Sequence, residues 1–168
     1  MKELLSIRNL ILSLIAFLLL SCQDEDSGKA IRLRNHSESG CKKIETAYGT
    51  SQTERRQAKK MFGNEATERV SLKGNEKGML NVLHENAIFT CEAIFTNSVE
   101  VSKATIIVNE DAPASTNCIC LYDLTSEIGP LENKTYTLII KNNNAVICSH
   151  QFKYSDNLDE SFNITRNE

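Results

Sequence analysis

The chain has 168 residues and a formal net charge of −3 at pH 7, and 40% of its residues are hydrophobic. This weakly acidic balance excludes a partner held by a basic surface, so we expect no nucleic acid. Tryptophan is absent and aromatic residues make up only 6% of the chain, which argues against a stacking platform for glycans. The length is that of one folded domain plus shorter flanking segments.

Residues 1–21 are typical of a signal peptide. Lys2 and Arg8 precede an apolar run at residues 10–20, as a charged n-region precedes an h-region. An uncleaved transmembrane anchor is the weaker alternative, because a membrane span needs about 20 apolar residues. The run ends in Leu19-Leu20-Ser21-Cys22, which resembles the lipobox of bacterial lipoproteins. That resemblance implies cleavage between Ser21 and Cys22 and acylation of Cys22, which anchors the chain in a lipid bilayer.

Residues 22–40 are polar and charged without an apolar period, which predicts a flexible tether. Its first residues after the cysteine are Gln23, Asp24, Glu25 and Asp26. This acidic cluster resembles the export signal of lipoproteins from Bacteroidetes, which implies display on the outer face of the outer membrane. The simpler interpretation is a solvated tether beside the membrane, and it leaves the periplasmic face as the alternative location.

Residues 41–67 show no consistent period. Within them Ser51-Gln52-Thr53-Glu54 has the spacing of a capping box, and Gly63 is a suitable helix end. We therefore predict a short helix at 51–63. Its basic residues are interpreted as a solvated helix face rather than a binding patch.

Residues 68–154 contain short runs of alternating apolar residues, which predict strands. The runs lie at 68–72, 79–84, 87–95, 99–101, 104–108, 118–128, 136–140 and 145–154, and the expected turns include 109–111, Gly129-Pro130 and Asn142-Asn143-Asn144. This spacing predicts an all-β fold, an antiparallel sandwich of about seven strands. Residues 155–168 are interpreted as a polar C-terminal tail, in which Leu158, Phe162 and Ile164 could dock one more strand.

The segment Leu131-Glu132-Asn133-Lys134-Thr135-Tyr136-Thr137-Leu138 resembles the corner of fibronectin type III and related immunoglobulin-like domains. In those domains a tyrosine that enters a late strand bonds back to the preceding corner. The resemblance implies an immunoglobulin-like sandwich in which Leu131 and Tyr136 form a structural corner. The tryptophan and cysteine spacing of antibody domains is missing, so an antibody-type domain is not expected.

Once Cys22 is acylated, five cysteines remain: Cys41, Cys91, Cys118, Cys120 and Cys148. An exported chain favours disulfides, and an odd number leaves one thiol over. Cys118 and Cys120 share one strand face about 7 Å apart, so each is better placed to bridge to a neighbouring strand. We expect Cys91 to pair with Cys118 or Cys120, Cys41 to staple the early segment, and Cys148 to pair or stay buried.

The functional alternative is a metal-binding or redox-active site built from Cys91, Cys118, Cys120 and either His84 or His150, since these ligand types suit zinc or copper. Against it, the C-x-C spacing is not that of a zinc knuckle. His84 lies on an apolar strand face, where a hydrogen-bonded core histidine is the simpler interpretation. Neither an oxyanion hole, a paired-carboxylate motif nor a phosphate loop can be identified, so we predict no catalytic residue, no enzyme, no metal and no cofactor.

The run Cys118-Ile119-Cys120-Leu121-Tyr122-Asp123 and the corner at 131–136 are similar to those of small lipoproteins from gut and oral Bacteroidetes. This resemblance covers about half of the predicted mature chain and implies no specific activity. It implies a non-enzymatic binding or structural module of the cell envelope, with a protein or a glycan as its partner. The alternative is a periplasmic metal-binding or redox-active lipoprotein that uses Cys91, Cys118 and Cys120.

Overall fold

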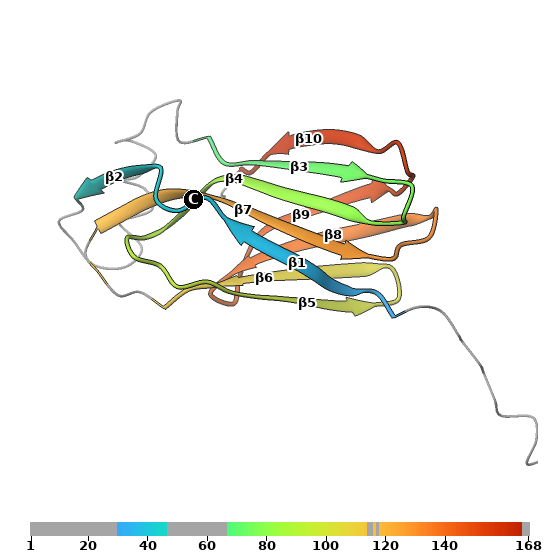
Figure 1. Ribbon diagram of the computed structural model, residues 1–168, viewed down its shortest axis with the longest axis horizontal. Coiled ribbons are helices and arrows are strands. Elements are labelled where there is room, and N and C mark those ends of the chain that lie inside the picture. The colour runs from blue at the N-terminus through green and yellow to red at the C-terminus, as the bar shows by residue number, and fades with distance from the viewer. Residues whose placement is uncertain (1–29, 47–66, 114–115, 117, 166–168) are drawn as a thin grey trace, which may run out of the picture.

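The computed structural model describes residues 30–46, 67–113, 116 and 118–165. Within these ranges the chain is all-β, without a helix, and forms two facing sheets (Figure 1). The strands are β1 (Arg32–Glu38), β2 (Lys43–Thr46), β3 (Arg69–Gly74), β4 (Leu80–Thr90), β5 (Thr96–Ser102), β6 (Thr105–Asp111), β7 (Cys118–Gly129), β8 (Thr135–Asn142), β9 (Ala145–Lys153) and β10 (Asp159–Asn163). No helix in the described part of the chain is long and apolar enough to span a membrane.

The larger sheet has six strands in the order β1-β7-β4-β3-β10, and β2 also pairs with β7. The smaller sheet has four strands in the order β5-β6-β8-β9. The prediction of a purely antiparallel sandwich is wrong at one place, because β6 and β8 pair in parallel, from Thr105 opposite Thr137 to Glu110 opposite Asn142. The chain crosses to the other sheet as β7 between these two strands, and the two reversals of direction leave them parallel.

Three strands lie outside the predicted domain of residues 68–154. β1 occupies residues 32–38, where we expected a tether, and pairs with β7 from Arg32 opposite Gly129 to Glu38 opposite Leu124. β2 lies in the segment without a period, and β10 lies in the expected polar tail and pairs with β3. Backbone pairing to the longer β7 forms β1 and β2 without a strong apolar alternation of their own. In and beside β10, Leu158, Phe162 and Ile164 pack against the apolar core, which confirms the predicted docking of one more strand. The signal peptide and the predicted helix at 51–63 lie outside the described residues.

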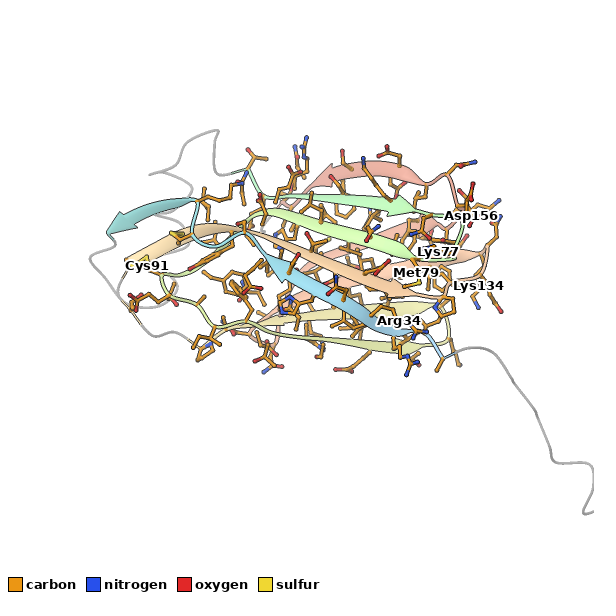
Figure 2. The ribbon with its side chains drawn as sticks, in the orientation of Figure 1. Arg34, Lys77, Met79, Cys91, Lys134 and Asp156 are labelled. Carbon is orange, nitrogen blue, oxygen red and sulfur yellow. A yellow bond between two sulfur atoms is a disulfide. The ribbon has the colours of Figure 1, made fainter. Side chains whose placement is uncertain are left out.

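Two apolar clusters can be identified among the described residues of the interior. The first, here called the large core, contains thirteen buried residues from both sheets: Val70, Leu72, Leu80, Val82, Ile106, Val108, Ile128, Leu131, Tyr136, Leu138, Ile140, Phe152 and Tyr154. The second, here called the cysteine end, contains seven: Ala87, Phe89, Cys91, Ala112, Cys120, Tyr122 and Leu124. Figure 2 places Cys91 at one end of the sandwich and Lys77, Met79 and Lys134 at the other.

A β-bulge lets a single strand serve both clusters. The runs at 79–84 and 87–95 were predicted as separate strands, but residues 80–90 form the continuous strand β4. Leu80, Val82 and His84 face the interior as predicted, and after a register shift between His84 and Ala87 the interior positions become Ala87 and Phe89. Asn86 has a φ of 58° at this shift. The extra residue changes which of the following side chains point to the interior, and the strand continues past it.

Two of the predicted turns had opposite outcomes. The turn at 142–144 is confirmed, because Asn143 and Asn144 have positive φ between β8 and β9. The turn at 109–111 is wrong, because these residues belong to β6 and Glu110 is only 2% exposed. A polar triplet after a β-branched run is typical of a turn, but here its middle residue faces the interior.

Candidate functional site

Two disulfides staple the cysteine end. Cys91 pairs with Cys118, closing a sequence separation of 27 residues, and Cys41 pairs with Cys120 across 79 residues. The first joins the end of β4 to the start of β7, and the second joins the segment between β1 and β2 to β7. These pairs agree with the expectations that Cys91 bridges to β7 and that Cys41 holds the early segment. The sequence had left open which cysteine of β7 serves which bridge.

Tyr122, two residues after Cys120, holds an aromatic cluster in place. Its ring centroid lies 5.0 Å from that of Phe95 and 6.4 Å from that of Phe89, with the rings edge to face. Its hydroxyl donates to the Thr90 carbonyl at 3.2 Å and accepts from the Ala93 amide at 3.4 Å. The aromatic side chains therefore fix the turn that follows β4, beside the Cys91–Cys118 bridge.

Asp123, on the outer face of the same strand, forms hydrogen bonds to neighbouring segments. Its carboxylate accepts from Lys42 Nζ at 2.7 Å and from the Asn86 backbone amide at 3.0 Å. Its own amide donates to Ser39 Oγ at 2.9 Å. Residues 118–123 thus attach β7 to four neighbouring segments: the end of β4, the turn after it, the bulge of β4, and the connection from β1 to β2. This run is a structural junction, and the side chains of Cys118, Cys120, Tyr122 and Asp123 are occupied by these contacts.

A layer of buried polar residues lies between the two apolar clusters. On β4, β6 and β7, one inward-facing polar residue separates the residues of the large core from those of the cysteine end; on β8, one separates the large core from the turn that follows. These residues are His84 on β4, Glu110 on β6, Ser126 on β7 and Asn142 on β8. Each of them is at most 3% exposed. We call these four residues the polar layer. Buried polar groups of this kind have to be bonded, because desolvation penalises an unmade hydrogen bond.

The strongest contact of the polar layer joins the two sheets. His84 Nδ1 of the larger sheet lies 2.8 Å from Glu110 Oε2 of the smaller sheet, and both side chains are buried. On the other side of the imidazole ring, Glu68 Oε1 lies 3.8 Å from Nε2 and also accepts the Ile88 amide at 3.3 Å. His84 is therefore the hydrogen-bonded core histidine that the sequence predicted, with a carboxylate near each ring nitrogen.

The fifth cysteine stays reduced. Cys148 lies on β9 and packs against the edge of the large core. Burial raises the pKa of its thiol to about 11, and the nearby Glu110 carboxylate adds to the shift. A thiol in this environment is protonated at neutral pH and is a poor nucleophile and metal ligand.

The predicted corner residues are both buried, and Tyr136 accepts a hydrogen bond from the Glu132 backbone amide at 3.1 Å through its hydroxyl. Its ring stacks on Phe152, with the centroids 5.9 Å apart. The hydroxyl therefore ties the start of β8 back to the loop that precedes it.

The other two histidines also contact residues of the opposite sheet. His150 of β9 stacks on Phe162 of β10 with the ring centroids 3.9 Å apart, and its Nε2 lies 3.1 Å from Glu160 Oε1. His36 of β1 lies 3.1 Å from the Asn97 amide of β5. These contacts hold the two edges of the sandwich, as the His84–Glu110 contact holds its centre.

The arrangement gives no support to a metal site at Cys91, Cys118 and Cys120. All three sulfur atoms are in disulfides, and His84 and His150 are each occupied by glutamates. Among the described residues, no group of three or more histidine, cysteine or acidic side chains is arranged to hold a metal ion.

The sequence had not indicated the partners of His84. Glu68 stands before β3, and Glu110 was assigned to a turn; only the inward position of Val108, two residues earlier on β6, could have pointed to Glu110. Asn142 of the polar layer was likewise assigned to a turn, and the inward position of Ile140 on β8 could have pointed to it. The predicted lipidation site Cys22 and the acidic cluster Gln23, Asp24, Glu25 and Asp26 lie outside the described residues. No protein-family model matches this chain, and neither does any curated protein or solved structure.

Proposed function

We propose that this protein is a lipid-anchored, non-enzymatic binding or structural module of the cell envelope, displayed on the outer face of the outer membrane. The observation that carries the proposal is the lipobox-like sequence Leu19-Leu20-Ser21-Cys22 ahead of a β-sandwich that contains two disulfides. Disulfides persist in exported proteins and not in reducing compartments. An acylated Cys22 provides the anchor, and the polar residues before β1 hold the sandwich clear of the lipid headgroups.

The finer fold assignment belongs to the same proposal. We infer an immunoglobulin-like sandwich of the fibronectin type III kind, supported by the Tyr136 corner and by two facing sheets that exchange strands. Such sandwiches serve as rigid supports for recognition through their loops and edges. A protein or a glycan is the expected partner, and the side chains of Cys118, Cys120, Tyr122 and Asp123 serve the support rather than the recognition.

Membrane fractionation tests the anchor. Replacing Cys22 with alanine removes the acylated sulfur and is expected to move the protein from the membrane fraction to the soluble fraction. The matched control is Cys148→Ala, which removes a different unpaired cysteine and leaves the anchor in place. If the Cys22→Ala protein stays in the membrane fraction while the control behaves as the native chain does, the lipoprotein assignment is wrong.

Protease shaving of intact cells tests the location. The native protein is expected to be cleaved, and a variant with alanine at Asp24, Glu25 and Asp26 is expected to be protected. Protection of the native protein as well would place the domain on the periplasmic side and would exclude an external partner. Cleavage of both proteins would mean that export does not depend on the acidic cluster.

A further inference from the structure

We propose that the cysteine end is a separate unit of the sandwich that opens when its two disulfides are reduced, while the large core stays folded. The proposal goes beyond the anchoring function and does not depend on it. It gives the protein a redox-sensitive end, in which reduction frees β2 and exposes the cluster of Phe89, Phe95 and Tyr122.

The first support is the division of the interior. The polar layer of His84, Glu110, Ser126 and Asn142 separates the apolar residues of the large core from those of the cysteine end. Apolar packing transmits cooperativity through direct contact, and in this layer the two sheets meet instead through the hydrogen bond between His84 and Glu110. The two clusters can therefore have different local stabilities, as separate cooperative units have.

The second support is the size of the two clusters. The large core contains thirteen buried residues and includes four aliphatic pairs from neighbouring positions on β3, β4, β6 and β8. The cysteine end contains seven among the described residues, and two of these are the disulfide-bonded Cys91 and Cys120. Ile88, Ile119 and Leu121 are also buried at this end but belong to neither cluster. The cysteine end has fewer apolar residues than the large core, so the two disulfides carry a larger share of its stability.

The third support is the way the disulfides are placed. Both lie at the same end of the molecule, on positions 118 and 120 of β7, and Cys91, Cys118 and Cys120 belong to or pack against the cysteine end. β2 has four residues and, among the described strands, pairs with β7. Besides the Cys41–Cys120 bridge, the described contacts in this region are that pairing and the contacts of Lys42 and Ser39 with Asp123 just before β2. A pairing of four residues is marginal by itself.

Both bridges can be reached by a reductant. In the Cys41–Cys120 bridge, Cys41 is exposed while Cys120 is buried; in the Cys91–Cys118 bridge, Cys118 is partly exposed while Cys91 is buried. A dithiol attacks the accessible sulfur as a thiolate, forms a mixed disulfide, and then closes on itself. Each S–S bond takes two electrons and two protons, giving two protein thiols, and the dithiol is oxidised to its cyclic disulfide.

Amide hydrogen exchange on the full-length detergent-solubilised protein tests the proposal, with dithiothreitol as the dithiol. After complete reduction, amides at Phe89, Ile119 and Tyr122 are expected to exchange at least about tenfold faster than in the oxidised protein. Amides at Leu72, Val82, Ile106 and Leu138 are expected to change less than about twofold. The matched control is Cys148→Ser, which keeps both disulfides and is expected to show the same pattern.

Two outcomes would overturn the proposal. If both groups of amides lose protection together, the sandwich is one cooperative unit and the polar layer does not divide it. If neither group changes after thiol titration has verified reduction, the disulfides do not hold the cysteine end. The double variants C41S/C120S and C91S/C118S repeat the comparison without a reductant, and each is expected to speed exchange at the cysteine end alone.

Discussion

Replacing His84 with leucine is expected to destabilise the protein strongly, because it leaves Glu110 buried without its partner. The two side chains are 0% and 2% exposed, and their closest atoms are 2.8 Å apart. Removing one member of a buried charged or hydrogen-bonded pair costs about 3 to 5 kcal/mol, a large part of the 5 to 15 kcal/mol that stabilises a typical domain. For a folding unit of this size we expect the melting temperature to fall by roughly 10 °C or more.

The double variant H84L/E110L separates the loss of the pair from the loss of packing. When apolar side chains replace both partners, the buried polar groups disappear together, and such changes are often close to neutral. We therefore expect H84L/E110L to be more stable than H84L by about 2 kcal/mol or more. Urea unfolding followed by circular dichroism measures each free energy of unfolding, provided that the m-value is unchanged.

A matched cycle at the surface provides the control. His150 and Glu160 also form a histidine–glutamate contact, at 3.1 Å, but their side chains are 32% and 38% exposed. Glutamine at these two positions is expected to give a coupling energy below about 1 kcal/mol. Our reasoning on the polar layer is refuted if H84L/E110L loses as much stability as the two single variants combined, or if the buried cycle couples no more strongly than the surface cycle.

Two further predictions concern single groups. In Tyr136→Phe the Glu132 amide loses its acceptor while the ring keeps its packing on Phe152, so stability should fall by about 1 kcal/mol, and an unchanged urea midpoint would show that the hydroxyl does not hold the corner. The raised pKa of Cys148, about 11 in the folded protein against a usual 9.0, should slow alkylation by iodoacetamide at pH 8 by about 100-fold or more relative to the urea-unfolded chain. The folded-state rate should then climb between pH 9 and 11, and a rate already at its plateau by pH 9 would contradict the raised pKa.

The sequence predicted the strands whose side chains alternate between interior and solvent. β7 is one example, since Cys118, Cys120, Tyr122, Leu124 and Ile128 all face inward along an uninterrupted strand, as their spacing predicts, although Ile119 and Leu121 on its other face are buried as well. β8 and β9 were predicted for the same reason, and so was the asparagine turn between them. The alternation of apolar and polar residues is enough to predict a strand wherever one of its faces is buried and the other is exposed to solvent.

The rest depended on contacts between distant segments. β1 is mostly exposed and has few apolar residues, so its strand conformation comes from the backbone of β7 rather than from its own side chains. The bulge at Asn86 shifts the alternation of β4 by one position, which in the sequence is indistinguishable from a turn. Glu110 follows a β-branched run and has the composition of a turn, and only the facing His84 accounts for its burial.

The most direct test of the whole account is the intact mass of the protein purified from membranes, after alkylation of free thiols without reduction. We expect a chain that begins at Cys22, carries acyl groups on that residue, contains two disulfides, and gains a single alkyl group at Cys148 once it is unfolded. A chain that still begins at Met1, or one that gains five alkyl groups, would contradict the anchored, disulfide-bonded sandwich described here.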